Sequence, residues 1–453
     1  MSVAPLSPVD VFEAPFAGTT RVFDETARGG SYAKVADQPS FPFQSRHSEL
    51  RRVGYDPTTQ ELVFFAPGGG AGDLPEVLGK PRRPGLSFAG FRGARVSSQT
   101  YAEFKRQQRC ITHERAVAAT LVQPPGNQFH ALTSTLAPLL AYAEGRPALF
   151  LNDWAHADAL FTNDGGELVR SGVSAELVRR ERRQYDAFFD TKLWADARGQ
   201  RLCFESLTVG YDERDSLNGF VYASNGLVVT SAHAARAPAT SQFARSSRSL
   251  RRLRDELSAA FAPPGAYDGP RSETTKVLVV ERPKTRNFKS TAAVLEEVRR
   301  GCFEATRASC DVEPVDLERL SYEAQIAKLA AAHALVGVEG MGLANMLYLR
   351  ANSSVVVLVP EGFDEAAVDY VSMAALLGLR VESTLLLASP RRPSLHGNRE
   401  ADLSQKGYWT NRTNDLVFAP GVVATAVTRA LGGAGAAPTA RQRVIGLRHP
   451  NVP

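Results

Sequence analysis

One glycine-rich turn in the last third of the chain carries the residue types best suited to bind a phosphate. It separates two short apolar runs, 335–338 and 355–359. Glycines let the backbone approach a ligand closely, and a helix that opens at such a turn directs free amides at one point. The turn therefore predicts a nucleotide or phosphate site, against the alternative of a purely structural turn. The residues concerned are Glu339, Gly340, Met341, Gly342, Leu343 and Asn345.

Two arginines follow an earlier apolar run in the same half of the chain. Arg282 and Arg286 come directly after residues 276–281. The planar guanidinium fork matches the oxygens of a phosphate group. The carboxyl ends of parallel strands meet at one edge of a sheet, so the arginines and the glycine turn can face one crevice. We predict a diphosphate clamp there, with two ordinary surface arginines as the alternative.

The first half offers two candidates for proton transfer. Asp153 closes a predicted strand at 148–151 and is the best-placed carboxylate for a general base. His130 stands where a loop enters a helical segment, and it could contact a ligand or take a proton. The alternatives are a solvated loop carboxylate and a structural histidine.

The elements that must position these residues are regular after residue 270. Strand-like and helix-like segments alternate, which predicts a parallel sheet covered on both faces. Such a sheet binds ligands beyond the carboxyl ends of its strands. Ser290 has the side chain and position of a helix N-cap. The predicted strands are 276–281, 311–315, 335–338, 355–359 and 380–383, and the predicted helices are 290–300, 321–332, 343–349, 364–377 and 421–431.

The first half is less regular, and a proline- and glycine-rich tract at 262–270 separates it from the second. We predict strands at 61–66, 116–122, 148–151 and 202–209, and an amphipathic helix at 241–261. The predicted domains are an irregular arm at 1–60, an acceptor-side domain at 61–265 and a nucleotide-binding domain at 266–453.

Composition narrows the function classes. The 453 residues carry a formal net charge of +5, and no aromatic-interleaved basic module points to nucleic acid. No apolar run approaches the ~20 residues that span a bilayer. The amino terminus has neither a basic nor an apolar leader region, so we expect no signal peptide. The four cysteines have no metal-like spacing, and Cys302 and Cys310 could bridge in an oxidising compartment.

Four sequence elements, in the same order, resemble the signature of glycosyltransferase family 61. The segment 321–349 resembles its glycine-turn element, Arg282 and Arg286 match its two arginines, and the resemblance covers roughly residues 110 to 380. The remaining two elements are NQFHALTSTLAP at 127–138 and the Cys203-Phe204 to Val209-Gly210 segment.

The resemblance implies an α/β fold of the GT-B type, with two Rossmann-like doubly wound domains facing a central cleft. It implies an inverting transfer of sugar from a UDP-sugar to a hydroxyl of a glycan or glycoprotein, with no metal and no cofactor beyond the donor. Relatives of this kind work in the Golgi or endoplasmic reticulum lumen. The absence of a visible leader leaves a cytoplasmic location open.

Three positions depart from the family pattern. Glu339 stands where the turn has histidine, Ser134 replaces an acidic residue four positions after His130, and Val357 replaces a glutamate. A carboxylate beside a diphosphate costs about 4 kcal/mol at ~4 Å and an effective dielectric near 20 unless cations offset it. The alternative function is therefore a catalytically degenerate member that binds a glycan or nucleotide. An unrelated Rossmann enzyme is disfavoured because no G-x-G-x-x-G motif is present.

Overall fold

The computed structural model describes residues 20–22, 32–37, 46–66, 93–120, 126–152, 175–191, 199–211, 215–217, 220, 242–281, 288–360, 364–388 and 416–432. The chain divides into two compact units, Ala14–Gly219 and Phe220–Pro453 with Met1–Glu13. Among the helices in the described ranges, none combines the length and apolar character that a bilayer crossing requires.

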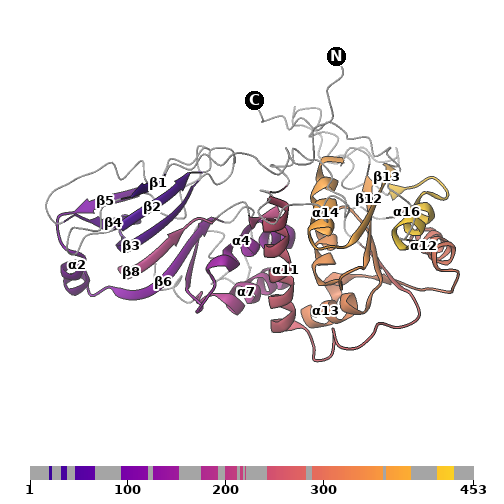
Figure 1. The fold of residues 1–453 in the computed structure, drawn as a ribbon, viewed down its shortest axis with the longest axis horizontal. Helices are drawn as coiled ribbons and strands as arrows, with labels where there is room; N and C mark the ends of the chain where they lie inside the picture. Colours follow the sequence, from indigo (N-terminus) through magenta and orange to yellow (C-terminus); the bar gives the residue numbers. More distant parts are fainter. Residues whose placement is uncertain are drawn as a thin grey trace, which may run out of the picture. The chain divides into compact units, whose positions relative to one another are not determined.

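The first unit is built on an eight-stranded mixed sheet (Figure 1). Its main path runs β1-β2-β3-β8-β6-β7, and β4 and β5 extend from β3. Pairing is antiparallel from β1 to β8 and parallel from β8 to β7. The strands are β1 (Thr20–Val22), β2 (Tyr32–Asp37), β3 (Arg46–Asp56), β4 (Glu61–Phe65), β5 (Gly93–Ser97), β6 (Ile111–Thr120), β7 (Ala148–Asn152) and β8 (Leu202–Val209).

This sheet differs from the doubly wound plan expected for the first half, because its parallel pairing is confined to β8-β6-β7 and to β4-β5. The reason lies in the connections. A tight turn at 57–60 joins β3 to β4, and a connection that short can only pair strands antiparallel. The expected irregular arm at 1–60 also contains β1, β2 and β3. Leu50, Val53 and Tyr55 of β3 are buried, so that strand is part of the sheet's core.

The first unit also contains helical segments. Thr100 caps α2 through a reciprocal capping box with Glu103. The segment from α3 to η2 is helical throughout, as the sequence predicted, but its centre η1 is a π-helix. The helical elements are α2 (Tyr101–Gln108), α3 (Gln128–His130), η1 (Ala131–Leu136), α4 (Ala137–Leu139), η2 (Leu140–Tyr142) and α7 (Ala175–Phe188).

All four cysteines form disulfides. Cys302 pairs with Cys310, the bridge that the sequence left open, and Cys110 pairs with Cys203 across 93 residues. The second bridge ties the start of β6 to β8, beside the apolar side chains of Phe65 and Phe104. No local sequence pattern predicts the Cys110–Cys203 bridge, because the two cysteines come together only when the sheet forms.

Removal of the Cys110–Cys203 bridge is expected to be the costlier of the two disulfide losses. The chain-entropy model gives about 4–5 kcal/mol for a loop of 93 residues and about 2–3 kcal/mol for one of 8. We expect Cys110→Ala with Cys203→Ala to lower the unfolding free energy about 2 kcal/mol more than Cys302→Ala with Cys310→Ala. Urea denaturation of the two double variants measures the difference, and equal losses would contradict the loop-length argument.

The second unit contains a six-stranded sheet of order β10-β9-β11-β12-β13-β14. Its first five strands are parallel, as predicted, and β14 is antiparallel to β13. Numbered from β9 onward, the parallel strands follow the doubly wound order 2-1-3-4-5. The strands are β9 (Lys276–Val280), β10 (Asp311–Val315), β11 (Ala334–Val338), β12 (Ser354–Pro360), β13 (Arg380–Ala388) and β14 (Leu416–Val417).

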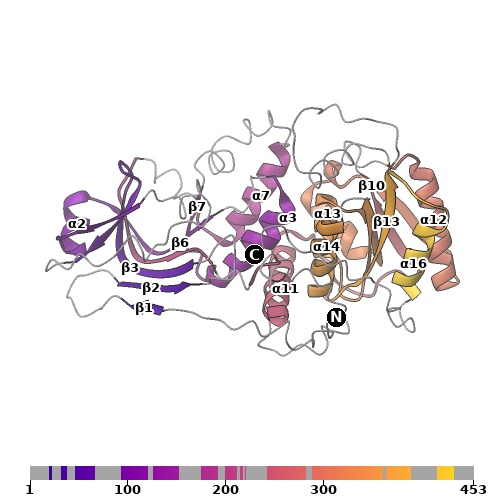
Figure 2. The same ribbon diagram turned by 90° about the horizontal axis from the view of Figure 1, so that it is seen from above.

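Helices cover both faces of this sheet, which confirms the layered prediction. Figures 1 and 2 show α12 and α16 on one face and α13 and α14 on the other. Ser290 and Ser321 cap α12 and α13 through their side-chain oxygens. The helical elements are α11 (Gln242–Phe261), α12 (Thr291–Thr306), η4 (Leu317–Arg319), α13 (Tyr322–Ala331), η5 (Met341–Tyr348), α14 (Asp364–Leu376) and α16 (Val422–Gly432).

The unit boundary lies earlier than residue 265. The apolar stripe of α11 contains Leu250, Leu253 and Leu257, all fully buried. Helix α11 is held to the second unit, because Ser247 Oγ donates to Leu376 O over 2.6 Å. The proline-rich tract therefore connects two parts of one unit, and the composition change that suggested a linker marks a loop.

Candidate functional site

The glycine turn lies at the topological switch point of the second sheet. From β9 the chain continues to β10 on one side, whereas β11 continues to β12 on the other. Connections that diverge from two adjacent strands leave a crevice at their carboxyl ends. Val280 ends β9 and Val338 ends β11, so the residues after both strands border this crevice.

Packing holds the turn against the end of β9. A Cβ on Gly342 would lie 3.0 Å from Val280 Cγ1, and one on Gly337 would lie 3.2 Å from Val280 Cβ. Gly340 has φ 138° and ψ 178°, a region that is essentially restricted to glycine. The glycines therefore let the turn pack closely on Val280, and the close approach to a ligand that the sequence predicts stays a prediction.

Two internal hydrogen bonds fix the turn. Leu343 N–H donates to Gly340 O over 2.9 Å, and Asn345 Nδ2 donates to Gly342 O over 3.1 Å. The amides of Met341 and Gly342 lie in the first turn of η5 and have no acceptor within that helix. Among the backbone hydrogen bonds between described residues, neither amide has an acceptor, whereas the Leu343 amide, expected to serve too, is used within the turn.

A pair of acids borders the turn. Glu339 is 4% exposed, and its N–H donates to Leu358 O. Burial, and next the charge of Glu339, raise the pKa of Asp369 in α14 to about 7. Two carboxyl groups thus lie in the immediate surroundings of the turn. Arg282 and Arg286, the expected cations, lie outside the described residues.

In the first unit, His130 ends α3 and leads into the π-helix η1. Ala137 N–H donates to Leu132 O, five residues back, which widens the helix. His130 Nδ1 lies 3.4 Å from Ser134 Oγ, one of the three departures from the family pattern. Burial lowers the pKa of His130 to about 4, so its imidazole is neutral at pH 7. Asp153, the other expected base, lies outside the described residues.

Sequence reasoning missed a buried carboxyl next to this segment. Glu181 of α7 is 1% exposed, and its Oε2 accepts from Gly126 N–H over 2.6 Å. Burial raises the pKa of Glu181 to about 7, although this hydrogen bond opposes the rise. A signal was available, because Glu181 and Gln184 fall on the same helical stripe as Leu177 and Phe188. Glu181 is too buried to touch a substrate. Its hydrogen bond with Gly126 N–H holds the loop that precedes His130.

The contribution of Glu181 to the unfolding free energy is expected to fall as the pH rises from about 4.5 to about 7. The folded-state pKa of Glu181 is above its usual 4.5, so the folded protein binds the extra proton and loses that stabilisation as pH rises through about 7. The contribution is at most about 3 kcal/mol. We expect the unfolding free energy of Glu181→Gln to rise relative to that of the wild type across urea titrations at pH 5, 6, 7 and 8. Glu318→Gln, at an exposed site, serves as the control and should leave the slope unchanged.

No group of three metal-binding side chains gathers anywhere in the part of the chain that the structure describes. The expected metal independence stays a prediction, to be tested by adding Mn²⁺.

The family model described as Glycosyltransferase 61 matches residues 128–356, which span the His130 segment, β8, β9 and the glycine turn. No curated protein matches the chain. Among solved structures, a flavo di-iron protein mutant from Thermotoga maritima is similar at 8% identity, covering 81% of this chain and 94% of its own. Its TM-score of 0.19 carries no argument about fold or function.

Proposed function

Because the chain belongs to the glycosyltransferase 61 family, we propose that it is an inverting, metal-independent glycosyltransferase that uses a UDP-sugar. The acceptor is a hydroxyl of a glycan or glycoprotein. The observation that carries the proposal is the glycine turn at the switch point of a doubly wound sheet. The GT-B plan, with a donor-side and an acceptor-side domain facing a cleft, is part of the same proposal.

The donor side would act on the leaving diphosphate. The amides of Met341 and Gly342 would donate to its oxygens, and Asn345 holds the turn in shape through Gly342 O. Arg282 and Arg286 would supply the positive charge that a metal supplies elsewhere. Donors that are already fixed in place stabilise developing charge without reorganising during the reaction.

The acceptor side would supply the base. In an inverting displacement the acceptor oxygen bonds to the anomeric carbon while the bond to the diphosphate oxygen breaks and its electron pair leaves with UDP. The hydroxyl proton passes to His130 or Asp153. His130 is neutral at pH 7 and free to accept it, but its lowered pKa makes it a weak base. That pKa is close to the ordinary value of an aspartate, so basicity does not separate His130 from Asp153 and both remain candidates.

A second candidate function is glycan or nucleotide binding without turnover. Glu339 and Ser134 are buried at the two proposed half-sites, and Val357 is fully buried in β12. A buried carboxylate beside the turn opposes a diphosphate, and the charge of Glu339 already acts on Asp369. This observation favours the second candidate.

Calorimetric titration with UDP, GDP and CMP, first without metal and then with Mn²⁺, tests the proposal. Metal-independent binding of UDP in preference to GDP and CMP supports it, and turnover of UDP-sugars is then screened. Binding that requires Mn²⁺ contradicts metal independence. No binding by any of the three nucleotides contradicts the donor site and leaves the glycan-binding candidate.

Replacement of Glu339 separates the two candidates. We expect Glu339→His to raise UDP affinity about tenfold or more if the carboxylate only repels the diphosphate, since even part of a ~4 kcal/mol repulsion corresponds to that factor. The readout is calorimetry together with UDP-sugar hydrolysis or transfer. A wild-type activity that disappears in Glu339→His would instead make Glu339 a working part of the reaction, and the degenerate-binder candidate would fail.

We further propose that the protein works in a secretory lumen. Its four cysteines are all paired, and disulfides persist in oxidising compartments and are rare in the cytosol. Alkylation of the protein isolated from its native source, denatured without reductant, should label none of the four cysteines. Labelling of all four would contradict the lumenal location.

A further inference from the structure

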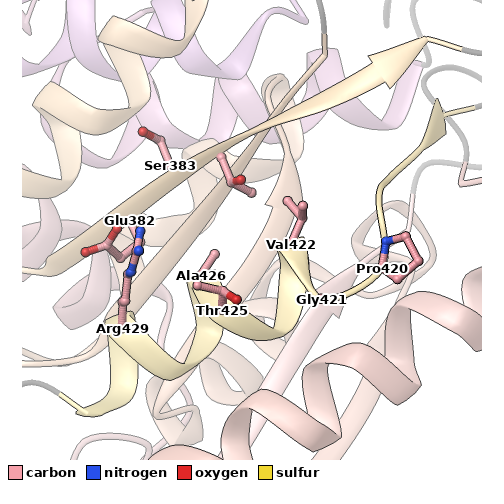
Figure 3. Close-up of a pocket in the computed structure, with 9 residues that line it drawn as sticks. Glu382, Ser383, Pro420, Gly421, Val422, Thr425, Ala426 and Arg429 are labelled. Atoms are coloured by element: carbon pink, nitrogen blue, oxygen red, sulfur yellow. The ribbon is translucent and has the colours of Figure 1, made fainter. Parts of the chain in front are cut away.

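A groove of about 300 Å³ lies between β13 and α16, on the face of the second sheet that α16 covers (Figure 3). Four polar side chains line it: Glu382 and Thr384 from β13, and Thr425 and Arg429 from α16. Successive side chains of a strand point to opposite faces, and Figure 3 shows the Ser383 side chain on the other side of β13. We call this feature the β13–α16 groove.

The polar side chains of the groove do not form hydrogen bonds or ion pairs with one another. Within the described residues, the side chains of Glu382, Thr384, Thr425 and Arg429 make no hydrogen bond, and Glu382 and Arg429 do not come within ion-pair distance. Burial raises the pKa of Glu382, and the charge of Arg429 only partly offsets this. A partly desolvated acid, a cation and two hydroxyls therefore converge on one space with their hydrogen-bonding capacity open.

The backbone of β13 offers further hydrogen-bond donors and acceptors. β13 pairs with β14 only at Leu387 and Ala388. From Arg380 to Leu386, its outer edge has no ladder partner among the described strands. An unpaired strand edge presents alternating backbone donors and acceptors.

Charge excludes ions as the natural occupant. An anion would meet Glu382, and the first amides of α16 are already used: Gly421 N–H and Ala424 N–H donate to the two carboxylate oxygens of Glu297, at 3.0 and 3.1 Å. A cation would meet Arg429 and find a single carboxylate. The fitting ligand is neutral and carries both donors and acceptors close together.

We propose that the β13–α16 groove binds a neutral sugar residue. Adjacent hydroxyls of a pyranose can donate to Glu382 and accept from Arg429, and each hydroxyl can also exchange a hydrogen bond with Thr384 or Thr425. Val422 and Ala426 offer aliphatic surface to the C–H face of the ring. The volume is at the small end of ligand pockets, which suits one sugar residue.

The groove is separate from the proposed donor site. β13 is two strands away from β11 in the sheet, roughly 10 Å at the usual strand spacing. The glycine turn contributes no residue to the groove. The inference therefore goes beyond the proposed transfer reaction and holds whether or not the protein catalyses it.

Ligand-observed saturation-transfer NMR of the full chain tests the proposal. The probes are the methyl glycosides of glucose, galactose, mannose, xylose and N-acetylglucosamine, with glycine and serine as zwitterionic probes. We expect at least one glycoside to receive saturation, and Glu382→Gln and Thr425→Val each to weaken its binding about fivefold, the usual effect of losing one hydrogen bond. Glu318→Gln, the same change at an exposed site of the same unit, should leave binding unchanged.

Two outcomes would overturn the proposal. The groove does not hold a sugar if no glycoside receives saturation. The same conclusion follows if Glu382→Gln and Thr425→Val both bind the glycoside as strongly as the wild type does. Stronger binding of glycine or serine than of every glycoside would make it an amino-acid site instead. UDP calorimetry on Glu382→Gln separates this result from the donor site, because a loss of UDP affinity in that variant would place the groove in the donor site and contradict their separation.

Discussion

Gly340→Ala is expected to weaken UDP binding about 10- to 100-fold while leaving the protein folded. Gly340 has φ 138° and ψ 178°, where a Cβ costs of order 1–3 kcal/mol. The turn can relieve this strain only by rotating the peptide that precedes Met341. That rotation would move the amides of Met341 and Gly342, which we propose as the diphosphate donors.

Two glycines of the same unit provide matched controls. Gly265 also has positive φ, at 81°, but a Cβ there meets nothing within 4 Å and the residue is remote in sequence from the turn. A Cβ on Gly432, at the end of α16, also meets nothing within 4 Å, and this residue has no positive φ. Gly265→Ala separates general backbone strain from a local effect, and Gly432→Ala reports the effect of the substitution alone.

Calorimetry with UDP and a urea denaturation curve are recorded for all three variants. The donor-site assignment is supported if only Gly340→Ala loses affinity. It would be refuted by wild-type affinity in Gly340→Ala with an unchanged urea midpoint, because a turn that tolerates the methyl group without effect is not holding the diphosphate.

Gly301→Ala is expected to lower the unfolding free energy by about 2–4 kcal/mol, the largest stability loss we expect from adding a single methyl group. Gly301 lies where α12 crosses α16. A Cβ there would be 2.3 Å from Ala424 O and 2.9 Å from Ala424 Cα. Both contacts are with backbone, which has no rotamer to change, so the two helices must separate.

Separation would also break polar contacts between the helices. Thr428 Oγ1 donates to Gly301 O over 3.1 Å, and Glu297 accepts from the first amides of α16. The intrinsic gain of alanine over glycine inside a helix, about 1 kcal/mol, only partly offsets these losses. Gly432→Ala is the control and should change stability by less than about 0.5 kcal/mol. A Gly301→Ala midpoint at or above that of the wild type would contradict the close packing of α12 on α16.

The sequence determined the parallel part of the second sheet and its helices. β-Branched runs such as Val355–Val359 and caps such as Ser290 and Ser321 act over a few residues, so they can be read without knowing what packs against them. The position of the glycine turn at the carboxyl end of a strand could be predicted too, because the strand and the turn are also local sequence patterns. The resemblance of the chain to its family could be recognised from four sequence elements in a fixed order.

Only the tertiary structure decided how distant segments meet. It paired Cys110 with Cys203, set the antiparallel half of the first sheet and attached α11 to the second unit. It also showed that Glu181 is buried against Gly126 and that Glu382 and Arg429 share a groove. Strand order, burial and charge proximity depend on contacts between residues many positions apart. Local propensity carries no information about such contacts, so the chemistry that depends on them became visible only in the folded chain.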